Sequence, residues 1–169
     1  AGRIAAEGLV YAIVRPDGKH GVLVEVNCET DFVAMGDAFR ALCHSVAETI
    51  LEKRPASMEA LQAELGDSVK EAVAKIGENI QVRRFTRYEV AQAGLVHAYI
   101  HGGGRVGVLL ELATSEEAAQ RDEVKALAQE LALQIASMRP RYVAKENVPA
   151  DEVEHEKEIL KAQAINEGK

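Results

Sequence analysis

Cysteine and histidine side chains are the groups in this sequence that could act as nucleophile, general base or metal ligand. Cys28 and His44 could form a thiol nucleophile and its base. Nothing in their spacing singles them out as a catalytic pair. Cys43 falls on one face of a predicted helix with Phe39 and Val46, as a packed thiol does. We therefore interpret both cysteines as buried structural residues.

A glycine run and a pair of histidines imitate other reactive sites. His101-Gly102-Gly103-Gly104 resembles the oxyanion loop of esterases, but the sequence has no Gly-x-Ser-x-Gly motif. The Gly-Lys-Ser/Thr sequence of a phosphate-binding loop is missing as well. His97 and His101 would share a strand face about 13 Å apart, too far for one metal ion. We predict that the protein is not an enzyme and has no catalytic residue, metal or cofactor.

The composition indicates an aliphatic core and an acidic surface. Of the 169 residues, 47% are apolar and only 4% are aromatic, and the net charge is −7. Such a chain is a poor candidate for non-specific nucleic-acid binding, which uses Lys and Arg to neutralise phosphates. Arg83, Arg84 and Arg87 alternate with apolar residues, as on the solvated face of a strand. The alternative is an RNA-binding patch of a ribosome-associated module.

The cysteine count and the hydropathy pattern suggest the cytoplasm of a bacterium or an organelle matrix. Two cysteines are too few for a disulfide scaffold and lack a Cys-x-x-Cys spacing. Reduced thiols are therefore expected. No apolar run reaches the length of a membrane span, and residues 1–7 show no signal-peptide pattern. A chain that begins without Met is consistent with a processed or trimmed piece.

The sequence contains two copies of one unit. Residues 8–26 read GLVYAIVRPDGKHGVLVEV, and residues 94–112 read GLVHAYIHGGGRVGVLLEL, at an offset of 86. After one deletion the match resumes at an offset of 85. The matched apolar positions in this second stretch are Phe39, Leu42, Val46 and Ile50 against Val124, Leu127, Leu131 and Ile135. Two copies predict two similar subdomains rather than a solenoid, which needs more units.

Each copy is predicted to form a hairpin followed by a helix. The turns contain Gly18 and Gly102–Gly104, and each helix carries one apolar stripe for packing on the sheet. The predicted helix boundaries are Ser57, Asp67 and Thr114 as N-caps, Gly77 as a C-terminal residue, and Pro149 at the start of a last helix. A strand is expected over residues 79–90. The fold class is α+β: two duplicated subdomains, residues 1–90 and 91–169, each a small antiparallel sheet packed with helices.

The copies differ most just after their second strand. Residues 27–33 read NCETDFV, and an ungapped alignment sets Phe32 against Ala118. An aromatic beside a carboxylate at the start of a helix suits an interaction anchor. The alternative is that Phe32 covers the helix start in one copy only. Residues 74–80, AKIGENI, also occur once, either for a specific task or as a plain helix end at Gly77.

These two stretches carry a family resemblance. VEVNCETDFVA at residues 24–34 is similar to the signature of elongation factor Ts, a Thr-Asp-Phe-Val sequence after a strand. AKIGENIQVRRF at residues 74–85 resembles the second signature of that family. Residues 139–169 are similar to the segment that leads into its helical hairpin. The family's N-terminal three-helix module, most of that hairpin, the strand that returns from it and the C-terminal module have no counterpart here, so we expect a fragment or a partly ordered chain.

The resemblance implies a guanine nucleotide exchange factor that promotes GDP release from elongation factor Tu. It places Asp31 and Phe32, within a tip that also contains Thr30 and Val33, near the partner's magnesium and phosphate site. Ile76, Gly77 and Glu78 would press nearby. His101 matches a family residue that contacts the partner's third domain, unless it is only a hairpin-edge residue. From the charge and the hydropathy pattern we expect no direct nucleic-acid or membrane partner, and a homodimer is possible.

Overall fold

The structure is a computed structural model that describes residues 3–168. The chain divides into two compact units, residues 1–137 and residues 138–169. Residues 1–2 of the first predicted subdomain and residue 169 of the second lie outside the described range. Among the described residues, no helix is both long and apolar enough to cross a membrane.

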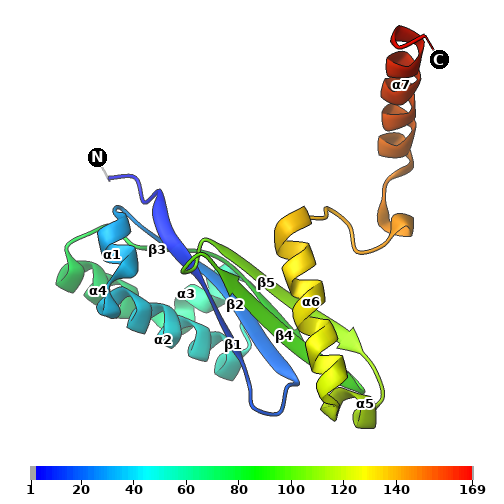
Figure 1. Ribbon diagram of the computed structural model, residues 1–169. Helices are drawn as coiled ribbons and strands as arrows, with labels where there is room; N and C mark the ends of the chain where they lie inside the picture. Colours follow the sequence, from blue (N-terminus) through cyan, green and yellow to red (C-terminus); the bar gives the residue numbers. More distant parts are fainter. Residues whose placement is uncertain (1–2, 169) are drawn as a thin grey trace. The chain divides into compact units, whose positions relative to one another are not determined.

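The first unit contains two antiparallel sheets, which confirms the α+β fold class (Figure 1). The sheet of the first copy has the strand order β1-β2-β3, and that of the second copy pairs β4 with β5. The strands are β1 (Glu7–Val14), β2 (His20–Cys28), β3 (Gln81–Glu89), β4 (Gly94–His101) and β5 (Val106–Ala113).

Helices follow the second strand of each copy and fill the stretch before β3. In the first copy they are α1 (Asp31–Met35), α2 (Asp37–Lys53), α3 (Met58–Leu65) and α4 (Ser68–Ile76). In the second copy they are α5 (Glu116–Gln120) and α6 (Asp122–Met138). The second unit holds a 3-10 turn (Lys145–Asn147) and α7 (Ala150–Asn166), which begins directly after Pro149 as expected.

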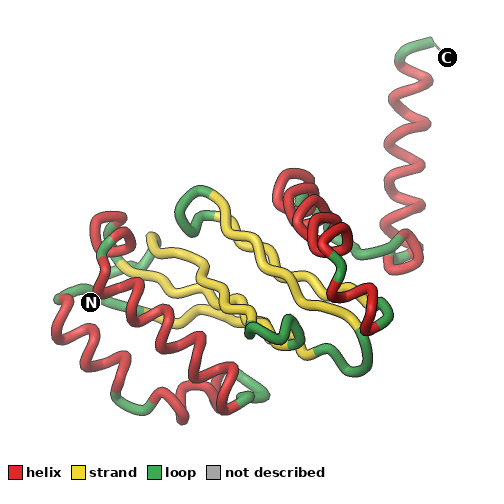
Figure 2. The backbone as a smooth tube through the Cα atoms, turned by 60° about the horizontal axis from the view of Figure 1, so that its bottom comes forward, coloured by secondary structure: helices red, strands yellow, loops and turns green. Residues whose placement is uncertain are grey.

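The first unit is layered, with helices outside and the two sheets between them (Figure 2). Successive strand residues point to opposite faces, so each sheet has a helix side and an inner side. Leu9 of β1 and Val24 of β2 face α2 in the core of the first copy. Leu95 of β4 and Val108 of β5 pack with α6 in a separate core. The inner faces of the two sheets therefore meet each other.

The inner faces approach closely because each copy places a glycine at the contact. A Cβ atom on Gly21 would lie 2.5 Å from Cγ1 of Val96 in the other sheet. A Cβ atom on Gly107 would lie 2.8 Å from Cγ2 of Val10. Gly21 and Gly107, like Val10 and Val96, are equivalent residues at the offset of 86. The contact is therefore made twice, once from each side.

Two equivalent hydrogen bonds also join the copies, one from each copy to the other. The backbone N–H of Val10 donates to the carbonyl of Gly104 at 2.8 Å, and that of Val96 donates to the carbonyl of Gly18 at 2.7 Å. Each hairpin turn thus satisfies an open backbone donor on the first strand of the other copy, where an unpaired edge group would otherwise remain. The two copies pack as the subunits of a symmetric dimer do, with one surface used by both.

Several predicted boundaries are confirmed, and one is modified. Ser57 accepts a hydrogen bond from the N–H of Ala60 at 3.1 Å and caps α3. Gly77 ends α4 with a φ of 83°. Asp67 precedes α4 but makes no capping bond, because its carboxylate pairs with Lys70 at 2.8 Å.

The strand expected over residues 79–90 contains an irregularity that the alternation alone did not predict. Val26 pairs with Val82 and Glu25 pairs with Arg84, so Arg83 is an extra residue on β3. This bulge shifts the alternation by one residue. Phe85 consequently packs against the same core as Val82.

The cap of α5 corrects the alignment of the copies. Ser115, not Thr114, is the N-cap, and its hydroxyl accepts from the N–H of Ala118. Thr30 caps α1 in the same way, because its hydroxyl accepts from the N–H of Val33, three residues later. The deletion therefore lies before these caps, so the structural equivalent of Phe32 is Glu117 rather than Ala118.

The predicted packing stripe of α6 is wrong in part. Leu127 and Leu131 were expected to face the sheet, yet 52% and 37% of their surfaces are exposed. Ala128 and Ala132 are completely buried instead. The helix packs closely on the sheet through these small residues, and the larger leucines lie to the side.

Gly21→Val and Gly107→Val are each expected to lower the free energy of unfolding by about 1–3 kcal/mol, because the new side chain overfills the inter-sheet contact. The measurement is urea denaturation followed by circular dichroism. Gln134→Ala, on the exposed face of α6, is the control and should change stability by less than about 0.5 kcal/mol. A Gly107→Val variant as stable as the unchanged protein would contradict this packing.

Candidate partner-binding site

Helix α1 forms a small tip between β2 and α2. It spans Asp31–Met35, and the hydroxyl of Thr30 accepts a hydrogen bond from the N–H of Val33 at 3.3 Å. At the other end, the N–H of Gly36 donates to the carbonyl of Val33 at 2.9 Å. A helix this short is not stable alone in water, so its conformation depends on contacts with the rest of the chain.

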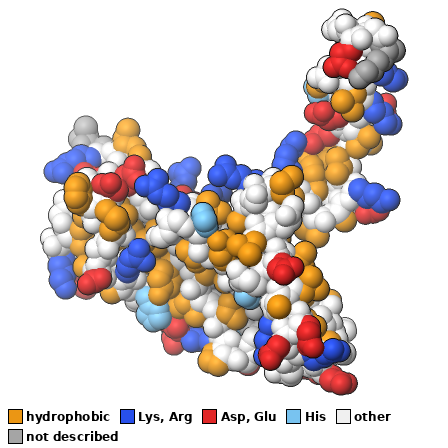
Figure 3. All heavy atoms as spheres, viewed as in Figure 1, with side chains coloured by type: hydrophobic (Ala, Val, Ile, Leu, Met, Phe, Trp, Pro, Cys, Tyr) orange, Lys and Arg blue, Asp and Glu red, His pale blue; other side chains and the backbone are white. Residues whose placement is uncertain are grey.

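The tip has an inner and an outer face. Ala34 is buried, and Val33 packs partly against the core of the first copy. Phe32 and Met35 point outward, with 80% and 63% of their surfaces exposed. Figure 3 shows hydrophobic side chains beside charged ones on the surface at the end of the molecule where α1 lies in Figure 1. The ring of Phe32 therefore covers little of its own helix and is accessible at the surface.

The tip is fixed by the carboxylate of Glu78. Its Oε2 atom accepts hydrogen bonds from the backbone N–H groups of Glu29 at 3.0 Å and Thr30 at 3.1 Å. Its Oε1 atom accepts from the hydroxyl of Thr30 at 2.6 Å. The two stretches that occur only once in the sequence are thus joined through one side chain.

The hydrogen bond from Thr30 is also the largest cause of a lowered pKa of Glu78. The N–H groups of Thr30 and Glu29 and the charge of Arg3 lower this pKa further. Each of these groups favours the ionised carboxylate. The tip is consequently held by a charged acceptor at neutral pH.

A second glutamate, Glu29, also joins the two stretches, and its carboxylate lies on the stretch opposite to that of Glu78. Oε1 of Glu29 accepts from the backbone N–H of Asn79 at 2.7 Å, and Oε2 pairs with Arg3 at 3.2 Å. The side chain of Asn79 donates to the carbonyl of Arg3 at 2.9 Å. Each stretch thus provides a carboxylate for the backbone of the other, and residue 3 is held beside them.

The remaining predicted contact residues of this region lie at the end of α4. Ile76 is half-buried against the core, and Gly77 is exposed. The N–H of Gly77 donates to the carbonyl of Val73 at 2.8 Å, which positions Glu78 toward Thr30. The structure therefore places the stretch of residues 30–33 beside the stretch of residues 76–78, and the printed hydrogen bonds between them run through Glu78.

His101 lies at the end of β4 and is exposed. Its Nδ1 atom is 2.8 Å from the hydroxyl of Tyr99. The turn that follows lies on the first copy, where the side chain of Arg40 donates to the carbonyl of Gly103 at 3.4 Å. His101 is thus available at the surface, in the second copy, while the tip belongs to the first.

The thiols are poorly suited to nucleophilic catalysis. Burial raises the pKa of Cys28 to about 11 and that of Cys43 to about 12, so both are protonated at neutral pH. The Sγ atom of Cys28 donates to the carbonyl of Thr30 at 3.2 Å. His44, the candidate base, is near the hydroxyl of Tyr11 at 3.3 Å. The expected burial of both cysteines is confirmed.

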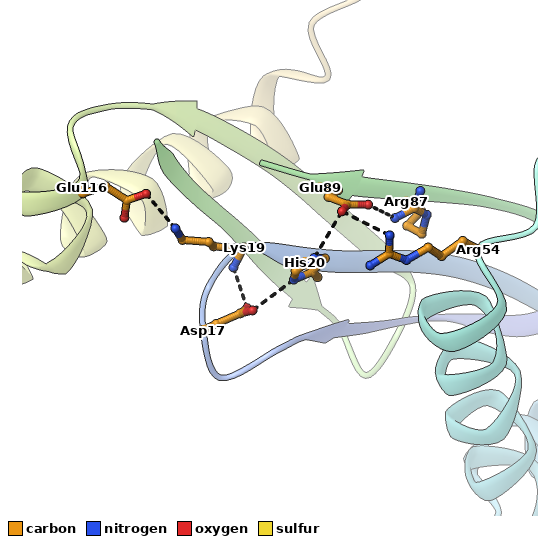
Figure 4. Close-up of polar contacts among 7 residues, drawn as sticks. All are labelled: Asp17, Lys19, His20, Arg54, Arg87, Glu89 and Glu116. Atoms are coloured by element: carbon orange, nitrogen blue, oxygen red, sulfur yellow. Dashed lines mark hydrogen bonds and ion pairs between the residues drawn. The ribbon is translucent and has the colours of Figure 1, made fainter. Parts of the chain in front are cut away.

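A second polar cluster lies at the β1–β2 turn, the opposite end of this hairpin from the tip (Figure 4). The N–H of Lys19 lowers the pKa of Asp17, and the guanidinium of Arg87 lowers that of Glu89. Lys19 also pairs with Glu116 of the second copy at 2.7 Å. The cluster consists of Asp17, Lys19, His20, Arg54, Arg87, Glu89 and Glu116. Within this cluster, the ion pair of Lys19 with Glu116 joins the turn to the second copy, and the other pairs lie within the first copy.

The basic cluster on β3 is largely neutralised. Arg84 pairs with Glu25 at 2.6 Å, and Arg87 pairs with Glu89 at 2.7 Å. Arginines that already face carboxylates release fewer counterions from a nucleic acid. This arrangement favours the solvated strand face over an RNA patch.

The fold and the tip define the class: a duplicated α+β protein in which one copy presents a preformed apolar helix tip. A sequence model of the family described as Elongation factor TS matches residues 29–169. The chain belongs to the elongation factor Ts family, as the resemblance of its two signatures indicated.

Curated relatives named Elongation factor Ts match this chain over its whole length. The protein of Symbiobacterium thermophilum is 72% identical over 170 residues, which are 56% of that relative. The protein of Aquifex aeolicus is 45% identical and that of Clostridium perfringens 46% identical, with 61% and 57% of their lengths covered. The chain therefore spans little more than half the length of these relatives.

Sequence reasoning missed two features of the tip. Met35 was not selected, although it follows Phe32 by three residues, the spacing of neighbours on a helix face. Glu78 was expected to press on a partner, whereas its carboxylate atoms bind Thr30 and Glu29. The helical spacing could have identified Met35. No local signal indicates the partners of Glu78, because they are distant in the sequence.

Glu78→Gln is expected to loosen the tip without unfolding the protein. The backbone N–H groups of Glu29 and Thr30 should exchange with solvent faster in the variant at pH 7, as measured by hydrogen exchange with mass spectrometry or NMR. Gln134→Ala is the control for an exposed substitution. Unchanged exchange at these two amides would contradict the role of Glu78.

The pH dependence has a defined sign. Because the folded state lowers the pKa of Glu78, its stabilisation is present above the ordinary value of 4.5 and is lost as the pH falls through the folded value. The difference in unfolding free energy between the unchanged protein and Glu78→Gln should therefore shrink on acidification from pH 7 to pH 3. A constant difference would contradict an ionised carboxylate at this position.

Proposed function

We propose that this chain is the core of a guanine nucleotide exchange factor that promotes GDP release from elongation factor Tu by binding, without covalent chemistry. The observation that carries the proposal is the exposed aromatic ring of Phe32 on a tip fixed by Glu78. The equivalent position of the second copy holds Glu117 on the same scaffold. The scaffold thus does not require an aromatic here, which supports a role in recognition.

The neighbouring carboxylate supports the same interpretation. Asp31 and Glu116 are equivalent first residues of α1 and α5. Glu116 pairs with Lys19, whereas Asp31 forms no ion pair with any residue in the described part of the chain. An unpaired acid beside an exposed ring is suited to a site that displaces a magnesium ion or its ligands on a partner.

The mechanism is thermodynamic linkage. A GTPase holds GDP through backbone amides around the phosphates and through a bound magnesium ion. If Phe32 and Asp31 bind a conformation of the partner in which these groups are displaced, binding of this chain weakens the binding of GDP. GDP then weakens the binding of this chain by the same factor. No proton transfer or bond cleavage by this chain is needed.

The free energy gained by burying one side chain limits how much Phe32 alone can weaken GDP binding. A buried Phe side chain supplies about 1.5–3 kcal/mol of apolar transfer free energy. Each tenfold weakening of GDP needs about 1.4 kcal/mol of differential binding. The ring can therefore account for a tenfold to roughly hundredfold weakening of GDP binding, and a larger effect needs further contacts.

The other residues of the site have different proposed roles. Ile76 and Gly77 form the neighbouring contact surface, and His101 reaches a second region of the partner from the second copy. Thr30, Val33 and Glu78 act chiefly by holding the tip, since their contacts lie within this chain. We further propose a cytoplasmic or organelle-matrix setting and a division into subdomains at residues 1–90 and 91–169. A homodimer stays a prediction.

Phe32→Glu, the residue of the second copy at this position, is expected to lower the rate of GDP release at least tenfold, in line with the loss of about 1.4 kcal/mol or more. The assay is release of a fluorescent GDP analogue from elongation factor Tu. Circular dichroism should show an unchanged fold, since the ring is 80% exposed.

Glu117→Gln is the matched control at the same helix position of the second copy, and it should leave release unchanged. Release by Phe32→Glu at the normal rate would refute the assignment of the tip. A loss of activity in both variants would indicate a general effect of helix-start substitutions instead.

A further inference from the structure

Met35 is the second exposed apolar residue of the tip. It is 63% exposed and lies three residues after Phe32, so the two side chains are neighbours on one face of α1. The second copy has Gln120 and Glu117 at the equivalent positions, both exposed and polar. One scaffold therefore carries a polar pair in one copy and an apolar pair in the other.

We propose that Met35 is a second partner-contacting residue of the tip, and that its oxidation to the sulfoxide weakens the contact. The inference rests on the proposed function, in which Phe32 meets elongation factor Tu. The partner's complement would be an apolar surface that extends along α1 past the Phe32 ring. A methionine side chain suits such a surface, because its unbranched thioether adapts to an irregular apolar partner.

Met35 can be oxidised to the sulfoxide because its side chain is exposed. Hydrogen peroxide transfers one oxygen atom to the sulfur, which loses two electrons, while the peroxide is reduced to water. The product is polar and would bring a dipole to the apolar contact. Methionine sulfoxide reductases reverse the change.

Among the other sulfur-containing residues of the described chain, Met138 is the one as exposed as Met35. Cys28 and Cys43 are buried, and burial keeps their thiols protonated, the less reactive form. Met58 packs partly against the core of the first copy. Met138 is 68% exposed, at the end of α6. Met35 and Met138 are thus the two exposed methionines of the described chain, and Met138 serves as an internal control.

The first test compares Met35→Gln with Met35→Leu in the GDP release assay, at a concentration of the chain that does not saturate elongation factor Tu. Met35→Gln, which copies the second repeat, should lower the rate about fivefold to tenfold, and Met35→Leu by less than about twofold. Normal release by Met35→Gln, when Phe32→Glu is inactive, would overturn this inference alone. Normal release by both Met35→Gln and Phe32→Glu would overturn this inference and the proposed function together.

The second test treats the chain with hydrogen peroxide, removes the oxidant and then adds the partner. Mass spectrometry measures sulfoxide at each methionine. The unchanged protein and Met138→Leu should lose activity to the level of Met35→Gln, Met35→Leu should keep it, and sulfoxide reductase should restore it. Full activity with Met35 completely oxidised, or an equal loss in Met35→Leu, would overturn the oxidation effect.

Discussion

The conformation of the candidate site depends on the carboxylate of Glu78, which binds the backbone and hydroxyl of Thr30 across 48 residues of sequence. Helix α1 is too short to be stable alone, and its inner residues add only a small apolar contact. A charged acceptor that satisfies N–H groups at a helix start supplies the missing stabilisation. Because Glu29 binds Asn79 in return, the two segments fix each other. Phe32 can then stay exposed, since burial of its ring is not required to hold the tip.

The duplication separates what the scaffold requires from what the site adds. Both copies have the hairpin, the close glycine contact, the docked turn and a Ser or Thr cap on the following short helix. These shared features account for the packing of the two sheets. The exposed ring of Phe32, the unpaired Asp31 and the bridge from Glu78 occur in the first copy. The second copy has a glutamate and a glutamine on the same outer face. Specialisation of one copy thus changes the surface and leaves the shared packing intact.

Much of the fold follows from local patterns in the sequence. The hairpins, the cap at Ser57 and the helix end at Gly77 are set by nearby residues, and the structure confirms them. The position of the deletion between the copies was not predictable, because either of two adjacent residues, Thr114 or Ser115, can cap a helix. The stripe of α6 was wrong because two buried alanines allow a close approach that hydrophobicity alone does not favour. Phe32 could be selected from its chemistry, whereas the role of Glu78 depends on a contact between distant segments.

We propose that the tip is complementary to a form of elongation factor Tu that has released GDP. Linkage then requires this chain to bind the nucleotide-free partner more tightly than the GDP-bound partner. Isothermal titration calorimetry with each form measures the two dissociation constants directly. We expect at least a tenfold difference in favour of the nucleotide-free form, which corresponds to about 1.4 kcal/mol. Equal affinity for the two forms would contradict it.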